Sequence, residues 1–542
     1  MKKLFFTFLF ILAFIAHGIT QNIWENTNTE VHPFLYRMAQ KGLIEYNDLI
    51  KPINRVHVLN ALNILQEKDS ILTTIEKKEL NFYLQEYTRP AKEQISLFKK
   101  DQNKRWRAGA ITSNEFEFYI DPLLGINNFS GNNKNISQLS NGFELWGTAG
   151  KNRNIGYQVY YRDYTETGTV NNNFRVESST QGTILVGAKS DNKINYTDIR
   201  ANINYSWKKG NISMGKDNLI WGYGENSNIV LSNKAPSYPY IRLDYKPLKW
   251  LNFNYTHAWL NSNIPDSSLS YLTNSGRIDN DFRLVFVQKY LATHSIDVQA
   301  MKGLNIAIGE SIVYSDKMDP GFLIPINLFK FYDNNRSNFL IEAGSNGQYF
   351  LSLSSRNQIK NTHLYSTLFI DEIRVSSIFN KTESRNQLGF NLGASITDVF
   401  IPYLTLGAEY TRVNPFVYSN LIPAQNYTSY NYILGDWMGN NFDKAILFTK
   451  YTPIAKLKLV ARFQKIRKGG SGTIYEQYAV QPQPAFLFDY IKTRSDLFLQ
   501  ARYEYINNIY LTSSLTLMQT KLAYGNVVKD NTYQLGISVG LP

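Results

Sequence analysis

The chain has 542 residues, a formal net charge of +13 and no cysteine. The absence of cysteine excludes disulfide bonds and thiolate metal sites, so a chain of this length needs an extensive sheet or core for its stability. After the first 20 residues no run of about 18 apolar residues occurs, which excludes transmembrane helices. Length alone allows several domains, or one large barrel with a small appendage.

Residues 1–20 have the pattern of a secretory signal peptide. Two lysines precede the mostly apolar run Leu4–Ala16, which is too short to span a bilayer. We predict an exported mature chain, with cleavage after Gly18 or just before Gln21. Its net charge falls from +13 to +11 when Lys2 and Lys3 are removed. A positive exported chain suits acidic polymers and anionic lipid head groups, whereas its dispersed basic residues argue against nucleic-acid binding.

Residues 21–104 differ from the rest of the chain because their apolar positions follow a helical period. A first helix is predicted to end at Gly42, and a second to begin after the cap residue Asn54. A third begins at the capping-box pattern Thr73-x-x-Glu76. Three short helices bury little apolar surface alone, so we expect this periplasmic helical bundle to dock on something larger.

From about Arg105 to the end, the side chains alternate with a period of two, which predicts β-strands. The stretch Thr197–Lys208 shows the pattern with an apolar, aromatic-ended face opposite a polar and charged face. Lys209-Gly210-Asn211 is predicted to turn the chain, with Gly210 at a positive φ. Such faces suit a wall that separates lipid from water.

The connections between the predicted strands differ in length. Short turns are predicted at Lys302-Gly303, Ser345-Asn346-Gly347 and Ile506-Asn507-Asn508, and longer connections at 165–180, 262–283, 315–337, 412–443 and 466–494. Short turns on one side and long loops on the other are typical of outer-membrane barrels. We therefore predict that residues 105–542 form an all-β, transmembrane antiparallel β-barrel of about 18 strands with long extracellular loops.

Three stretches of the sequence stand out as motifs: HPFLYRMAQKGLIEY…KPINRVHVLNALNIL, MGKDNLIWGYGENSNIVLSNKAPSYPYIRL, and EYTRVNPFVY…NYTSYNYILGDWMGNNFD at Glu409–Asp443. Together they resemble the Wzi family of capsule-assembly outer-membrane proteins, in its Bacteroidetes-type form. The resemblance implies a barrel of this size with a periplasmic helical bundle against its inner mouth. It also implies a role in holding capsular polysaccharide at the cell surface, and it brings no catalytic motif.

A surface glycan receptor needs aromatic faces for sugar stacking and cations for acidic sugars. The loops at 412–443 and 466–494 supply both. The candidate polysaccharide-binding residues are Arg412, Phe416, Tyr418, Tyr427, Tyr430, Tyr432, Trp437, Arg467, Lys468, Tyr475 and Tyr478, with Tyr490 beside them. The alternative is that these aromatic side chains pack the loops onto each other and close the barrel mouth.

No enzymatic, cofactor or metal site is predicted. The histidines show no metal-ligand spacing, and Gly222-x-Gly224 is too short for a phosphate loop. His294 and Ser295 are neighbours on opposite faces of one predicted strand, so they do not form a nucleophile–base pair.

The predicted function is therefore binding of capsular or extracellular polysaccharide, with assembly or retention of the capsule, by an outer-membrane protein. The alternative is a porin or channel for anionic or saccharide solutes, although helices docked on the inner mouth would occlude its lumen. The expected partners are capsular polysaccharide, outer-membrane lipid and lipopolysaccharide. Capsule-export machinery is a further candidate, and no nucleic-acid partner is expected.

Overall fold

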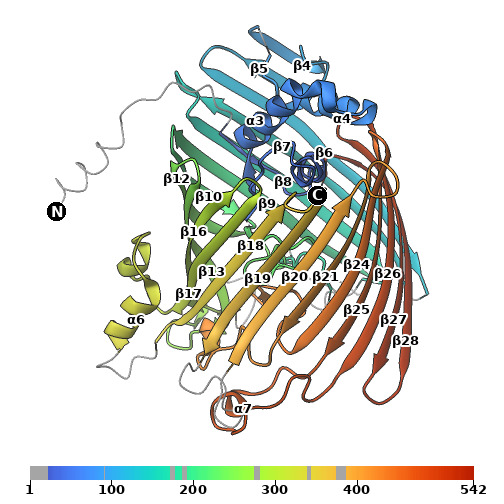
Figure 1. Cartoon of the computed structure of the whole chain (residues 1–542). Coiled ribbons are helices and arrows are strands. Elements are labelled where there is room, and N and C mark those ends of the chain that lie inside the picture. Colours follow the sequence, from blue (N-terminus) through green and yellow to red (C-terminus); the bar gives the residue numbers. More distant parts are fainter. Residues whose placement is uncertain are drawn as a thin grey trace, which may run out of the picture.

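The structure is a computed structural model that describes residues 22–541 except 91, 133, 171–177, 186–191, 274–280, 338–343 and 374–385, so the predicted signal peptide lies outside the described residues. Within them, 18 antiparallel strands form a closed barrel (Figure 1). The wall strands are β6 (Phe116–Gly131), β7 (Lys134–Ala149), β8 (Ile155–Gly168), β9 (Lys193–Trp207), β10 (Gly210–Asp217), β12 (Tyr238–Leu248), β13 (Leu251–Pro265), β16 (Phe286–Met301), β17 (Leu304–Ser315), β18 (Asn346–Arg356), β19 (Thr362–Ile373), β20 (Asn386–Thr397), β21 (Leu404–Val413), β24 (Phe442–Ile454), β25 (Leu457–Lys468), β26 (Lys492–Ile506), β27 (Ile509–Leu522) and β28 (Val527–Val539). The predicted all-β barrel of about 18 strands is confirmed.

The two faces of the wall explain the alternation in the sequence. In β9, Ile199 and Ile203 point outward and are 41% and 56% exposed, whereas Asn202 and Asn204 point inward and are buried. The outer surface repeats this pattern around the barrel, which gives it an apolar band suited to lipid. Exposed members of this band include Ile126, Met214, Ile296, Ile308, Leu351, Leu392, Leu447, Leu499, Leu517 and Leu535.

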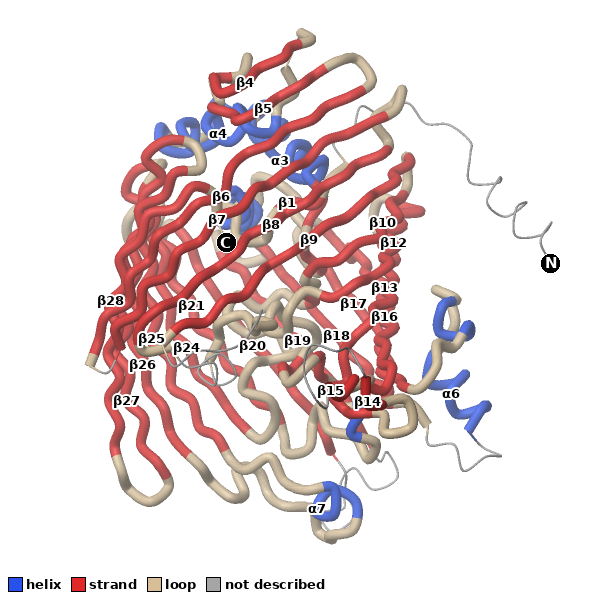
Figure 2. The backbone as a smooth tube through the Cα atoms, turned by 180° about the vertical axis from the view of Figure 1, so that it is seen from behind, coloured by secondary structure: helices blue, strands red, loops and turns tan. Residues whose placement is uncertain are grey.

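The two ends of the barrel differ in their connections. Turns such as 208–209, 302–303 and 507–508 lie at one end, which we call the short-turn end, and connections such as 414–441 and 469–491 lie at the other, the long-loop end. Figure 2 shows α3 and α4 at the first end and α7 at the second. Two connections at the long-loop end, after β6 and after β27, are also short.

Two predicted turn details are wrong. Asn346 and Gly347 begin β18 instead of forming a short turn, because the long connection that precedes them ends there. Gly210 lies within β10 opposite Trp207, and its φ is not positive. A Cβ at Gly210 would lie 2.4 Å from the Trp207 ring, so the glycine provides room for that ring.

The N-terminal segment folds into three α-helices as predicted, α2 (Val31–Gln40), α3 (Arg55–Glu67) and α4 (Thr74–Tyr87). The Asn54 side chain accepts a hydrogen bond from the Val56 amide at 3.0 Å, and Thr73 and Glu76 form the predicted capping box. In the described part of the chain, no helix is both long and apolar enough to cross a membrane. The remaining short elements here are β1 (Trp24–Glu25), β2 (Ile50–Lys51), β3 (Ile53–Asn54) and η1 (Asp69–Ile71), and β1 pairs with β3.

The helices have their own hydrophobic core. Its buried members include Val31, Leu35, Met38, Val58, Leu62, Leu65, Leu80 and Tyr87. The expectation that the helices depend on a larger body for burial is therefore only partly met, because they bury their apolar faces mainly against each other. Ion pairs and hydrogen bonds, such as Arg37 to Asp398 and Gln40 to the Ser395 carbonyl, join the helices to the barrel. Leu49 and Ile50, between α2 and α3, belong to the luminal hydrophobic cluster.

A hairpin separates the helices from the closed wall. Its strands are β4 (Gln94–Lys100) and β5 (Trp106–Thr112), so strand structure begins inside the predicted helical segment and the closed circuit starts at Phe116. β5 pairs with the first part of β6, from Glu117 to Ile120, and β28 pairs with the part from Leu124 to Gly131. Between these stretches, residues 121–123 pair only with β7 among the described strands.

The lumen is filled by chain from both ends. Residues 218–237, which connect β10 to β12, fold inward, and their short strand β11 (Ile220–Trp221) pairs with β2 of the N-terminal segment. The connection 414–441 also folds inward and contains η4 (Pro423–Gln425), β22 (Thr428–Ser429) and β23 (Tyr432–Ile433). Together these segments form a buried core with the inner face of the wall, in which Trp221, Leu231, Tyr427 and Phe369 are 0–1% exposed.

The connection 316–337 covers part of the outside of the wall. It contains η2 (Pro320–Leu323) and α6 (Phe329–Ser337), and both views place α6 outside β16 and β17 (Figures 1 and 2). Backbone amides of Phe329 and Lys330 donate to the outward-facing carboxylate of Glu310 at 3.0 and 2.6 Å. This cover hides a polar side chain that would otherwise face lipid. The remaining short elements are β14 (Tyr271–Thr273), β15 (Asp281–Arg283) and α7 (Ile474–Tyr478).

Candidate functional site

Several predicted site residues are buried in the lumen core at the long-loop end. Tyr418 and Tyr427 are 2% and 0% exposed, and their rings stack with centroids 5.5 Å apart. The Tyr418 hydroxyl donates to the carbonyl of Ile229 at 2.7 Å. Phe416 and Tyr432 are buried as well. Tyr418 and Tyr432 contact Ile229 and Lys234 of the 218–237 segment, whereas Phe416 stacks on Phe488 of the 469–491 connection. The faces of these buried rings are not open to a polymer in this arrangement.

The other predicted residues remain at the surface or partly exposed. They are Arg412, Tyr430, Trp437, Arg467, Lys468, Tyr475, Tyr478 and Tyr490. Tyr475, in α7, is 71% exposed. The Arg467 side chain is half exposed, and its Nε donates to Asp443 Oδ1 at 2.9 Å. We call this set the rim residues.

Cations accompany the aromatic rings of the rim. The Arg412 guanidinium lies 3.8 Å from the centroid of the Phe486 ring. Trp437 has two cations near its ring, Lys444 Nζ at 5.9 Å and the Arg494 guanidinium at 5.6 Å. Lys444 is buried and ion-paired with Asp436, whereas Arg412 and Arg494 are partly exposed. An aromatic face beside such a partly exposed cation can stack on the C–H face of a sugar and attract an acidic group on the same polymer.

Sequence reasoning missed Phe486 and Arg494, although both lie within the 466–494 loop, and it missed Lys444, which lies one residue beyond the 412–443 loop. It also missed the inward fold of residues 218–237. Ile229-Val230-Leu231 is a run of three apolar residues in a stretch otherwise rich in Gly, Asn, Ser and Pro. Such a run inside a long connection indicates burial, and this signal could have identified the luminal segment.

At the short-turn end, ion pairs attach the helical segment to the barrel. Arg37 of α2 and Lys41, which caps the C-terminal end of α2, both contact Asp398, at 3.0 and 3.1 Å. Asp48 accepts from Arg356 of β18 at 2.7 Å. Burial alone would raise the pKa of the Asp48 carboxyl, but the Arg356 and Lys51 cations outweigh it and lower that pKa to about 2.

Glu86, on α4, is the centre of the largest charged cluster at this end. Its carboxylate contacts Arg55 at 3.0 Å and both Arg105 and Arg107 at 2.7 Å. Burial would raise the pKa of Glu86, but these three guanidinium groups hold it far below its usual range. The cluster therefore stays ionised and links the helices to the β4–β5 hairpin.

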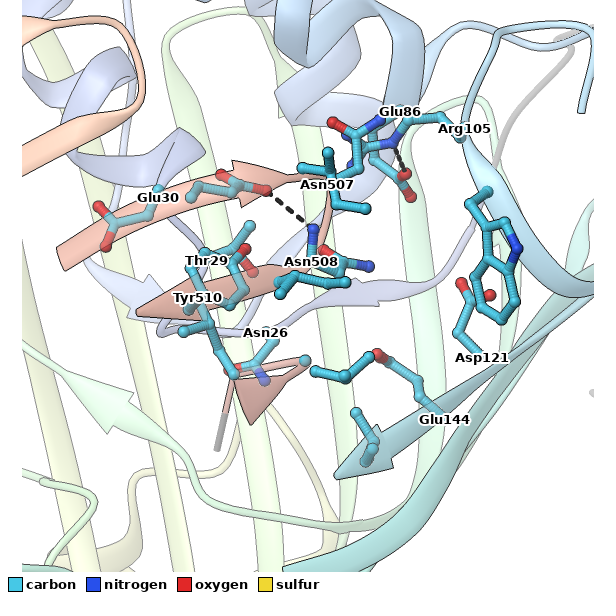
Figure 3. Close-up of a pocket in the computed structure, with 18 of the residues that line it drawn as sticks. Asn26, Thr29, Glu30, Glu86, Arg105, Asp121, Glu144, Asn507, Asn508 and Tyr510 are labelled. Atoms are coloured by element: carbon cyan, nitrogen blue, oxygen red, sulfur yellow. Dashed lines mark hydrogen bonds and ion pairs between the residues drawn. The ribbon is translucent and has the colours of Figure 1, made fainter. Parts of the chain in front are cut away.

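A cavity of about 410 Å³ lies beside this cluster (Figure 3). Figure 3 shows Glu86 next to Arg105, with Asp121 and Glu144 on wall strands and Tyr510 on β27. We call it the seam pocket, because residues 121–124 of β6 and 539–541 of the chain end line it. Across the described ranges, no three His, Asp or Glu side chains are grouped so as to hold a metal ion.

Comparison with solved structures identifies barrels of the same kind. The chain is similar to Wzi of Escherichia coli, described as an outer-membrane protein involved in group 1 capsule assembly and a carbohydrate-binding β-barrel, with 10% identity, a TM-score of 0.58, and coverage of 96% of this chain and 99% of that chain. It is also similar to OccD1 (OprD), with 12% identity, a TM-score of 0.43, and coverage of 82% and 98%. OccK5 (OpdH) of Pseudomonas aeruginosa gives 11% identity, a TM-score of 0.41, and coverage of 79% and 99%.

No protein-family model matches the chain, and no curated protein matches it. At 10% identity, the likeness to Wzi shows a shared barrel fold over nearly the whole of both chains.

Proposed function

We propose that this chain is an outer-membrane protein that binds capsular or extracellular polysaccharide at its long-loop end and helps to assemble or retain the capsule. The observation that carries the proposal is the rim, where partly exposed aromatic rings and cations lie above a lumen packed with buried side chains. The fold shared with Wzi, a carbohydrate-binding barrel, supports it. The proposed role is binding, without catalysis.

The proposed orientation follows from the two ends. The apolar outer band would face the lipid of the outer membrane, with lipopolysaccharide among the molecules around it. The long-loop end would face the outside of the cell, and the helices at the short-turn end would face the periplasm. This is the usual arrangement of short periplasmic turns and longer extracellular loops.

The alternative of a porin would need an open path through the barrel. The described residues of the lumen argue against such a path, because Trp221, Tyr223 and Tyr427 are 0–1% exposed and pack against the inner face of the wall from β12 to β24. We expect planar-bilayer recordings of the intact protein to show negligible steady conductance. A large constitutive pore would favour the porin instead.

The direct test measures polysaccharide retained per cell in a triple variant of the rim, Trp437→Ala, Arg467→Gln and Tyr475→Ala. Each contact is worth on the order of 1 kcal/mol, so single changes should loosen the capsule partially and the triple change should release most of it. Retention should also fall as salt rises if the polymer is acidic.

The matched control is Tyr524→Ala, at a ring that is 96% exposed in the short β27–β28 connection outside the rim. It should retain capsule normally. Normal retention in the triple variant, with a correctly folded barrel, would remove the rim from the mechanism. Replacement of the whole 414–441 connection would be a poor test, because this connection supplies core residues of the lumen.

A further inference from the structure

The wall of the barrel is interrupted at one place near the short-turn end. β6 pairs with β5 up to Ile120 and with β28 from Leu124 onward, so residues 121–123 pair with no described strand on that edge. Pro122 has no N–H and cannot donate a ladder hydrogen bond there. The seam pocket lies at this interruption, lined by residues 105–107, 121–124 and 539–541.

The outer lip of the seam pocket is apolar and exposed. Trp106, Leu124 and Ile506 line the pocket and are 43%, 48% and 47% exposed. Directly beside them on the outer wall, Ile126 of β6 and Ile537 of β28 are paired, and both are about half exposed. The lip is therefore continuous with the apolar band around the barrel, so acyl chains that contact the band would also reach the pocket.

The interior of the pocket is charged, and its charges are unevenly paired. Arg105 is 5% exposed; its Nε contacts Glu86, but its Nη1 has no hydrogen-bond partner among the described residues. Glu144 and Glu504 also line the pocket. Neither is within ion-pair distance of a described cation, although the Arg55 charge acts on Glu144 and the Arg105 charge acts on Glu504. Glu144 accepts from Gln158 at 3.3 Å and Glu504 from the Asn508 amide at 3.0 Å.

The unpaired groups define a ligand of mixed charge. A buried guanidinium N–H without an acceptor favours an anionic oxygen, and carboxylates without a cation favour an ammonium group. A cavity of about 410 Å³ is large enough for a head group of this kind. The apolar lip adds a place for the chains of an amphiphile.

We propose that the seam pocket binds the head group of an amine-bearing glycerophospholipid from the leaflet at the short-turn end. The phosphate accepts from Arg105, the ammonium faces Glu144 and Glu504, and the acyl chains lie along the lip. The inference rests on the proposed membrane location and is independent of polysaccharide binding, so capsule retention measured in the same variants separates the two.

The test uses the full chain purified in detergent and titrated with phosphatidylethanolamine or phosphatidylglycerol, with bound lipid counted by native mass spectrometry. The wild type should prefer phosphatidylethanolamine by about tenfold or more, equivalent to about 1.4 kcal/mol. The double variant Glu144→Gln, Glu504→Gln keeps the size of both side chains and should reduce this preference to about twofold or less. Arg105→Gln should weaken the binding of both lipids.

Glu45→Gln is the matched control, because Glu45 is exposed and does not line the pocket. It should bind lipid as the wild type does. Equal binding of the two lipids by the wild type would overturn the proposal, and so would an unchanged preference in the correctly folded double variant. If Arg105→Gln does not fold, the double variant alone decides.

Discussion

The helical segment and the luminal connections both fill the barrel, but they are held there by different forces. The helices bury their apolar side chains against each other and meet the wall through ion pairs such as Arg37–Asp398 and Arg356–Asp48. The connections 218–237 and 414–441 have no separate core in the described residues. They share one hydrophobic cluster with the inner wall, to which the N-terminal segment contributes Leu49 and Ile50.

This difference indicates how independent each region is. A body with its own core and a polar interface resembles a docked domain, whose attachment responds to charge and pH. A segment that shares its core with the wall is part of the barrel, so its loss weakens the barrel itself. Substitutions in each region test this contrast.

The largest effect is expected for Trp221→Ala in the lumen. Trp221 is 1% exposed and meets the Phe350 ring edge-on, with centroids 5.7 Å apart. Its truncation should lower the free energy of unfolding of the barrel by about 3–5 kcal/mol. This free energy can be measured by urea unfolding, with the folded and unfolded fractions separated by their different migration on gels without heating. Trp250→Ala is the control, because Trp250 is 50% exposed in a turn, and an equal loss there would contradict the contrast.

Glu86→Gln should loosen the helical segment and leave the barrel intact. The change leaves three buried guanidinium groups without their shared carboxylate. Breaking such a cluster costs about 3 kcal/mol or more. Limited proteolysis should cut residues 22–92 faster in this variant, while urea unfolding of the barrel stays unchanged. A parallel loss of barrel stability would show that the two regions unfold together.

The stability of the helical segment should also depend on pH. Burial lowers the pKa of His32 and His57 to about 4, below their usual value of 6.5. Between pH 6.5 and 4 the unfolded segment therefore binds protons that the folded segment does not, so its stability falls as pH falls through this window. Limited proteolysis at a series of pH values between 6.5 and 4 should show faster cleavage of the helical segment as the pH falls. In the double variant His32→Gln, His57→Gln, the rate of proteolysis should depend less steeply on pH. An equally steep pH profile would show that other titratable groups cause the effect.

The sequence predicts the wall well because one physical rule acts on every strand. Lipid lies outside and polar or packed lumen inside, so Ile199 and Ile203 must alternate with Asn202 and Asn204. The starts of α3 and α4 are also predictable, because the signals lie in neighbouring residues. The Asn54 side chain and the Thr73–Glu76 capping box accept hydrogen bonds from nearby backbone amides.

The interior of the barrel and the rim depend on contacts that no local pattern encodes. Tyr427 and Tyr475 are both aromatic residues in long connections, yet one is 0% and the other 71% exposed. What separates them is whether the connection folds into the lumen, and this depends on partners far away in sequence, such as Ile229 for Tyr418. Prediction of the seam pocket likewise depends on strand pairing, because the pocket lies where the pairing of β6 with β5 ends and its pairing with β28 begins.

The short ladder between β2 and β11 has a consequence for assembly of the protein. Its two strands come from opposite ends of the barrel, since β2 belongs to the N-terminal segment and β11 to the connection after β10. Ile50 and Trp221 can meet only when β10 and β12 already hold residues 218–237 in the lumen at the correct height. We therefore expect the ladder to form late, and only when the wall strands are paired in the correct register. Docking of the N-terminal segment would then occur only on a correctly folded barrel.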